Sequence, residues 1–288
     1  RNLSLSTSTQ DLTSQHPRHT RGFSDSYDFH GLSRRERQKK GWENEDPEIK
    51  KELKIQVTSA LWKLAENNVK NCRKIVETKA LICFAKLMGK ETDEALRKSV
   101  MTVMEITAAA ERDVEFRRFA FKKNSLSSKA VIDQLLRLIQ SGPADVQVPC
   151  LKAIGSLSRI FPDKETKVIH PLVHQLGNPH PEVAAEAARA LEKFAHTSNF
   201  LHLEHSKAIV DANAVPLLVQ LVGSDHDKDI QVPALILLSY LAMHVGDTDV
   251  LREYFILKTL KNLARTTVAQ IQSVHDVLSN AIQHLELF

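Results

Sequence analysis

The residues best suited to chemistry in this chain of 288 residues are two pairs of histidines. His170 and His174 are four positions apart, a spacing that places both imidazoles on one face of a helix and occurs in two-histidine metal sites. His202 and His205 flank Glu204 in a similarly short pattern. No third ligand accompanies the first pair, and no acidic general base stands where a metalloprotease carries one. We therefore interpret both pairs as ordinary surface or interhelix histidines and expect no metal site.

Motifs of catalysis and cofactor binding are also missing from the sequence. There is no glycine-rich dinucleotide fingerprint, no phosphate-binding Walker loop and no G-x-S-x-G nucleophile elbow. The three cysteines, Cys72, Cys83 and Cys150, are odd in number and lack C-x-x-C spacing. They are typical of the reduced thiols of a cytosolic protein. The sequence therefore predicts a protein that is not an enzyme, with no catalytic residues and no cofactor.

The dominant pattern of the chain is an internal repeat of about 44 residues. Residues 208–242 contain one complete unit: the end of a short helix, a corner at Asn213, a second helix ended by Gly223, an acidic turn and a long apolar helix. The final apolar helices recur at intervals of 43, 50, 37 and 47 residues, at Ala60, Val103, Ala153, Ala190 and Leu237. Four glycines follow apolar helices in the same phase: Gly89, Gly142, Gly177 and Gly223. This periodicity predicts a helical solenoid, in which each unit buries its apolar face against the next.

Two unequal intervals and one internal match refine this prediction. D-V-Q-V-P-C-L at 145–151 matches D-I-Q-V-P-A-L at 229–235, so we expect Asp145 and Asp229 to cap the final helices of two units. The 37-residue interval leaves little room for a first helix near residues 162–165, which predicts a unit of two helices. The 50-residue interval predicts an extended first helix and a loop within residues 111–130.

Composition divides the chain into two parts. Residues 1–41 are rich in Ser, Thr and basic residues, have no apolar period and are predicted to be disordered, whereas residues 42–288 are predicted to form the solenoid. The first 40 residues carry a net charge of +4 and the remainder is formally neutral, which disfavours a nucleic-acid-binding body. The first part contains one dense basic patch: Arg34, Arg35, Arg37, Lys39 and Lys40. This patch could contact an anionic membrane or act as a nuclear localisation signal, and a solvated linker is the alternative.

The sequence also bears on the location of the protein. No run of 18 apolar residues is present, and no charged segment followed by an apolar one resembles a signal peptide. We therefore expect a cytoplasmic protein. Residue 1 is Arg, so the missing initiator Met indicates a fragment or a processed chain.

The three-helix unit, with its segments VDANAVPLLVQLVGS and ALILLSYLA, resembles the armadillo repeat. This resemblance implies an all-α, right-handed superhelical solenoid that binds proteins along the row of its final helices. Armadillo carriers of nuclear cargo have a Trp in this row and an Asn four residues later, which grip a basic peptide. Of the corresponding positions here, only Trp62 matches, so a nuclear-import-type adaptor loses most of its support. The groove candidates, which could instead form a solvated face, are Trp62, Glu66, Glu105, Arg159, Glu192 and His196.

Longer segments resemble the plant armadillo-repeat-only proteins in particular. They are ALWKLAENNVKNCRKIVETKALICFAKLM, MEITAAAE, RRFAFKKNSLSSKAVIDQLLRLI, IQVPALILLSYLAMHV and FLHLEHSKAIVDA, and the similarity extends from about Trp42 to the final LELF. The resemblance implies a scaffold of cell polarity and tip growth at the cytoplasmic face of the plasma membrane. Its implied partners are exchange factors, dissociation inhibitors and activating proteins of Rho-of-plants GTPases. The substrate-binding part of a ubiquitin ligase is the alternative, and the oligomeric state is left open.

Overall fold

The computed structural model describes residues 46–122, 125–162, 167–223, 227–246 and 248–287. The chain divides into two units, residues 1–50 and residues 51–288. Of the first unit, residues 46–50 are described, and they contain the start of α2 (Pro47–Ala65), where the Glu48 amide donates to Asp46 Oδ1 at 2.8 Å. The predicted disordered segment 1–41, its boundary with the solenoid and its basic patch lie outside the described residues.

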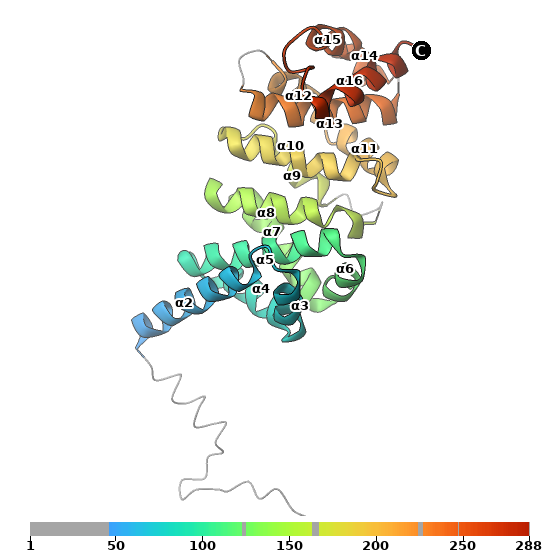
Figure 1. The fold of residues 1–288 in the computed structure, drawn as a ribbon. Helices are drawn as coiled ribbons and strands as arrows, with labels where there is room; N and C mark the ends of the chain where they lie inside the picture. Colours follow the sequence, from blue (N-terminus) through green and yellow to red (C-terminus); the bar gives the residue numbers. More distant parts are fainter. Residues whose placement is uncertain (1–45, 123–124, 163–166, 224–226, 247, 288) are drawn as a thin grey trace, which may run out of the picture. The chain divides into compact units, whose positions relative to one another are not determined.

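The described part of residues 51–288 contains helices and no strand (Figure 1). After α2, the helices fall into successive groups. The first group is α3 (Val69–Glu77), α4 (Ala80–Lys90) and α5 (Glu94–Arg112), and the second is α6 (Val114–Ala120), α7 (Leu126–Ser141) and α8 (Ala144–Ser156). The third is a short turn η1 (Ser158–Ile160), α9 (Ile169–Gln175) and α10 (Pro181–Ala195). The fourth and fifth are α11 (His202–Asp211), α12 (Ala214–Leu221) and α13 (Lys228–Val245), then α14 (Asp249–Glu253), α15 (Ile256–Leu263) and α16 (Gln272–Leu285).

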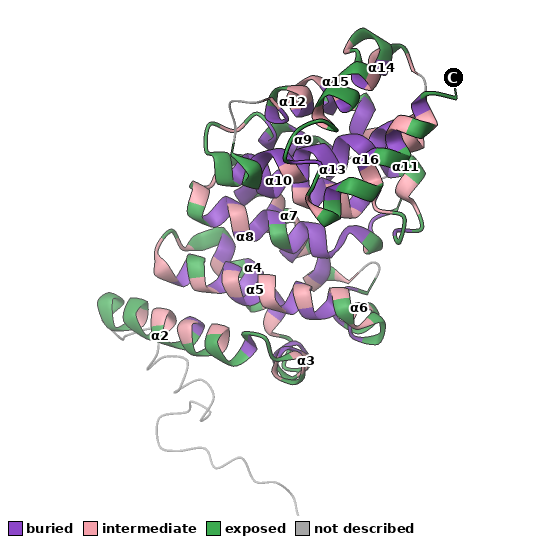
Figure 2. Cartoon of the chain, turned by 45° about the horizontal axis from the view of Figure 1, so that its top comes forward, coloured by how far each residue is buried: buried purple, intermediate pink, exposed green. Residues whose placement is uncertain are grey.

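The final helix of each group packs against the final helix of the next. The row α5, α8, α10, α13 and α16 is continuous, and each member contacts its neighbour (Figure 1). Buried residues run through the facing sides of these helices (Figure 2), with Ile106, Ile154 and Leu191 fully inaccessible. They belong to one apolar cluster that extends from α2 to α16. The prediction of an all-α solenoid is therefore confirmed for the described residues, because the repeated apolar faces share a single core.

Corners between first and second helices use left-handed backbone. Lys79, Asn213 and Phe255 precede α4, α12 and α15 with φ values of 62°, 65° and 50°. The corner expected at Asn213 is thus confirmed, since Asn tolerates this region better than most residues. The four phased glycines lie within or just after α4, α7, α9 and α12, but none of them has a positive φ.

The segment 111–130 departs from its prediction. Instead of an extended first helix and a loop, it contains the end of α5, the seven-residue α6 and the start of α7. Asp113 causes this break because it ends α5 and caps α6, accepting a hydrogen bond from the Phe116 amide at 2.9 Å. Ser125 then caps α7. In the third group, the described residues contain no first α-helix, in agreement with the short interval.

The internal match at 145–151 and 229–235 forms the same contact in both copies, although its acids are not caps. Pro143 and Asp227 occupy the N-cap positions, and Asp145 and Asp229 lie in the first turns of α8 and α13. The side chains of Gln147 and Gln231 reach back eight residues, donating from Nε2 to the carbonyls of Ile139 (2.7 Å) and Gly223 (2.5 Å). Each glutamine thereby satisfies a carbonyl at the end of the second helix.

Candidate functional site

We use the term ladder for the row of final helices together with the C-terminal half of α2. The six predicted groove residues lie at two places on it. Trp62, Glu66 and Glu105 belong to the end formed by α2 and α5, and Arg159, Glu192 and His196 belong to the part formed by η1 and α10. We name these two sets of residues, with the side chains that contact them, the Trp62 cluster and the His196 cluster.

The Trp62 cluster is built around a ring that the chain's own cations cover. The Nζ atoms of Lys63 and Lys98 lie 4.2 and 4.5 Å from the ring centroid, within the range of cation–π contacts. Indole Nε1 is buried and has no acceptor among the described residues. Because a buried donor is normally paired, this one marks an incompletely satisfied position on the ladder.

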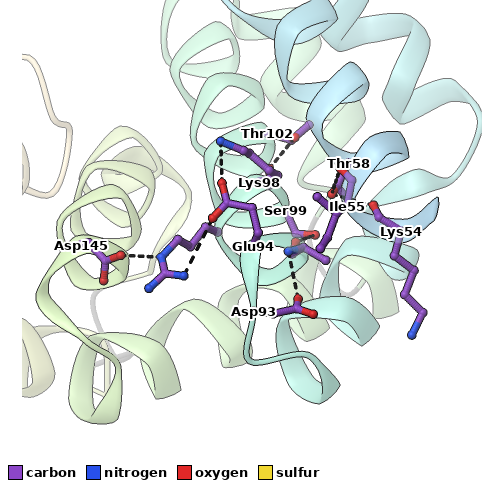
Figure 3. A network of polar contacts seen from close by, with 11 residues as sticks. Lys54, Ile55, Thr58, Asp93, Glu94, Lys98, Ser99, Thr102 and Asp145 are labelled. Atoms are coloured by element: carbon purple, nitrogen blue, oxygen red, sulfur yellow. Dashed lines mark hydrogen bonds and ion pairs between the residues drawn. The ribbon is translucent and has the colours of Figure 1, made fainter. Parts of the chain in front are cut away.

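Acidic groups hold the two lysines in place. Lys63 pairs with Glu66 at 3.2 Å, and Lys98 pairs with Glu94 at 2.8 Å (Figure 3). Glu105 makes a different contact, in which its Oε2 accepts a hydrogen bond from the backbone amide of Asn67 at 3.1 Å. The structure thus brings the three predicted residues of this end together, but through lysines and a backbone amide.

The same network joins α5 to α8. Asp145 Oδ2 accepts a hydrogen bond from Arg97 Nε at 2.5 Å (Figure 3). Arg189 of α10 also reaches the next ladder helix, donating from Nη2 to the backbone carbonyl of Asp229 in α13 at 3.0 Å. In each case an arginine of one ladder helix contacts the first turn of the following ladder helix, at a side chain in α8 and at a backbone carbonyl in α13.

The middle of the ladder is crossed by an ion pair. Lys193 of α10 reaches over α8 to Glu111 of α5, with Nζ and Oε2 2.7 Å apart. Gly155 of α8 lies directly against α10 beside this crossing: a Cβ there would be crowded at 3.0 Å from Ala190 Cα, and at 3.5 Å from Lys193 Cδ it would make an ordinary contact. The glycine therefore lets α8 and α10 approach closely at Ala190.

The His196 cluster joins the third and fourth groups of helices. Arg159 donates to Ser198 Oγ at 2.7 Å, and the same hydroxyl lies 2.8 Å from His196 Nδ1. The His196 ring packs against Tyr240 of α13 with centroids 5.5 Å apart. Two of the predicted residues, Arg159 and His196, are therefore linked through one hydroxyl.

Three ring residues of this cluster were missed by sequence reasoning. They are Tyr240, His244 and His202. The Tyr240 ring stacks on the His244 ring with centroids 5.7 Å apart, and the His244 ring meets the His202 ring edge-on with centroids 4.7 Å apart. His244 Nδ1 also lies 2.9 Å from Ser206 Oγ. The four-residue spacing of Tyr240 and His244 on an apolar helix was the available signal. His202 was considered only as half of a possible metal pair.

Burial sets the electrostatics of this cluster. Burial raises the pKa of Glu192, with Lys193 and Arg189 opposing the change. Burial, followed by the positive charge of Arg159 and by His202, lowers the pKa of His196. The pKa of Tyr240 is raised by burial and by Glu192. In all three titratable groups the shift of the pKa favours the neutral form: Glu192, Tyr240 and His196. This surface is therefore better suited to binding a partner through hydrogen bonds than through charge attraction.

The residues first considered for chemistry do not assemble into a site. His170 and His174 are exposed on α9, His205 is buried, and the described residues contain no cluster of three side chains able to hold a metal. Burial raises the pKa of the Cys72 thiol to about 11, and it raises the pKa of Cys150 further. The third thiol, Cys83, is exposed, and all three are free. No helix in the described part of the chain has the length and apolarity needed to span a bilayer.

These features define an α-solenoid with a polar and aromatic ladder. Residues 204–243, which cover α11 to α13, match the Armadillo/beta-catenin-like repeat family, so the fourth group is an armadillo repeat. No curated protein matches the sequence.

Several solved structures that are similar to this chain are engineered or designed proteins. An engineered protein is 23% identical over 81% of this chain and 90% of its own, with a TM-score of 0.65. A designed armadillo repeat protein is 19% identical over 80% and 92%, also at 0.65. Another, solved in complex with the peptide (KR)4, is 18% identical over 84% and 95%, with a TM-score of 0.63. At these identities the likeness establishes the fold.

Proposed function

We propose that this chain is a protein-binding scaffold without enzymatic activity, which binds a segment of its partner along the ladder. The Trp62 cluster is the observation that carries this proposal. Its ring and its unpaired buried Nε1 lie under two lysines, so a partner that displaces a lysine gains an aromatic face and a hydrogen-bond donor together.

The covering lysines also bear on the type of partner. One of the solved relatives binds (KR)4, a wholly basic peptide. In this chain Lys63 and Lys98 already occupy the space above Trp62, so an incoming lysine or arginine would meet two like charges. This disfavours a nuclear-import-type adaptor, and it favours partner segments with neutral or mixed side chains.

More specifically, we propose that the partners are regulators of Rho-of-plants GTPases: exchange factors, dissociation inhibitors or activating proteins. The segments that resemble plant armadillo-repeat-only proteins support this assignment. Purified regulators should bind the full chain in pull-down and calorimetric titration. The paired substitutions Glu66→Lys and Arg159→Glu, which keep the net charge, should weaken binding at least about tenfold because each ladder cluster loses a contact.

A matched control separates ladder contacts from general charge effects. Glu115→Lys with Arg118→Glu makes the same exchange on exposed positions of α6, outside the ladder, and should leave the affinity unchanged. Equal weakening by both pairs, or no binding of any regulator, would contradict the proposal. Tight binding of a (KR)4 peptide would instead support the import-type alternative.

We also propose a cytoplasmic location at the inner face of the plasma membrane, with the nucleus as the alternative. The support is the basic patch Arg34, Arg35, Arg37, Lys39 and Lys40, since each basic residue near an anionic surface is worth about 1 kcal/mol. Replacing these five residues by alanine in a fluorescent fusion of the full chain should release it from the cell periphery. An unchanged peripheral signal would argue against the membrane contact, and loss of a nuclear signal would support the alternative.

A further inference from the structure

The last corner of the array carries a side chain that suits it poorly. Phe255, between α14 and α15, has φ 50° and ψ 43°. Asn213 occupies the corresponding corner of the preceding repeat, and Asn is among the few residues that adopt this conformation readily. The Phe255 side chain is 71% exposed, so burial does not compensate for its conformation. A strained and exposed aromatic residue points to a role outside folding.

Phe255 lines a recess of about 560 Å³ between α14, α15 and α16. Other apolar lining residues include Leu251, Ile256 and Leu285 from these three helices. Leu251 and Ile256 are only 3% and 1% exposed, so they form a floor below the rim. The volume is in the range of about 300–1,000 Å³ that is typical of ligand clefts.

The rim of the recess is basic. Arg252, Lys258, Lys261 and Arg265 line it, and the described lining residues include no acid. Two acids outside the lining contact rim residues: Asp249 Oδ1 lies 3.5 Å from Arg252 Nη1, and Glu286 Oε1 lies 2.6 Å from Lys261 Nζ. Lys258 and Lys261 are three residues apart on α15, so they share one exposed face, and the exposed Arg265 lies in the turn that follows the helix.

We propose that this recess docks an acidic segment of a protein partner, which inserts an apolar side chain against Phe255 and the floor while its carboxylates meet the basic rim. A protein segment fits better than a membrane, because a single side chain can reach Leu251 and Ile256 whereas a flat headgroup layer cannot. The recess uses no residue of the Trp62 or His196 clusters. It is therefore a second binding surface, at the end of the array and separate from these two clusters.

Fluorescence polarisation with synthetic peptides tests the proposal. The probe is a labelled peptide of alternating Glu or Asp and Leu or Phe. The full chain should bind it, and added salt should weaken binding because the rim charges are exposed. Replacing the apolar residues by Ser, or the acids by Lys, should each reduce affinity at least about tenfold.

Phe255→Asn is the informative variant. Asn suits the left-handed corner, so the thermal midpoint should stay the same or rise while peptide affinity falls at least about tenfold. Lys258→Glu with Arg265→Glu should also weaken binding. Lys70→Glu with Lys129→Glu is the control, since it makes the same charge change on exposed positions of α3 and α7 and should retain affinity.

Several results would overturn the proposal. They are failure of the acidic probe to bind the full chain, and unchanged affinity in Phe255→Asn. Binding to phosphatidylserine vesicles that depends on Phe255, without peptide binding, would identify a membrane site instead. A dimer in sedimentation that dissociates in Phe255→Asn would identify a contact between two copies. The ladder variant Glu66→Lys with Arg159→Glu should bind the probe normally, so failure of the proposed ladder function would be distinguishable.

Discussion

Replacing Phe194 by alanine should lower the free energy of unfolding by about 3–5 kcal/mol, the largest effect we expect from a single substitution in this chain. Phe194 of α10 is 1% exposed. Its ring stacks on Phe161 with centroids 5.8 Å apart and meets His205 edge-on at 5.1 Å. It therefore joins α10 to the segment after η1 and to α11, and the alanine variant leaves a cavity between two repeats.

The position of this cavity affects how the variant unfolds. A solenoid is stabilised by contacts between neighbouring repeats, so a weakened central contact should broaden or split the urea transition. Phe200→Ala is the control because Phe200 is 94% exposed, and its loss should change stability by no more than about 0.5 kcal/mol. Equal losses in the two variants would contradict the packing described for Phe194.

The fold could be predicted from sequence because its signal is repeated. Apolar spacing of three and four residues places each helix, and recurrence of the same pattern fixes the phase of the array. The corner at Asn213 was predictable from a single residue, since Asn is favoured in left-handed backbone. The break at Asp113 was not, because one side chain ends α5 and begins α6 without interrupting the apolar pattern.

The site was less accessible to sequence reasoning because its contacts join distant residues. Lys193 and Glu111 are 82 residues apart in the sequence, and the packing of α5, α8 and α10 brings them together. On α13, Ser239 stands two residues after Leu237, as Trp62 stands two residues after Ala60, but Ser239 is 1% exposed and donates to the Leu235 carbonyl. The adjacent Tyr240 contacts His196 instead, since one residue turns the side chain by about 100° around the helix.

His244 should make the protein less stable at mildly acidic pH. Burial lowers its pKa from 6.5 to about 4, and the neighbouring His202 of α11, His284 of α16 and His196 at the end of α10 add to this effect. The unfolded chain therefore binds a proton between about pH 6.5 and pH 4 that the folded chain does not. The contribution to stability is fully present above pH 6.5 and is lost as pH falls through that window. We expect a loss of about 2–3 kcal/mol from this residue.

Urea unfolding of the wild type and of His244→Gln at about pH 7 and about pH 4.5 isolates the contribution, because carboxylates that titrate in both proteins cancel in the difference. Glutamine can retain a hydrogen bond to Ser206 but cannot gain a proton, so the variant should lose about 2 kcal/mol less on acidification. His170→Gln, on the exposed side of α9, should behave like the wild type. If His244→Gln loses as much stability on acidification as the wild type, then His244 is not the group that couples folding to pH. Protonation of the His244 imidazole would then cost no stability, despite its packing against the rings of the His196 cluster.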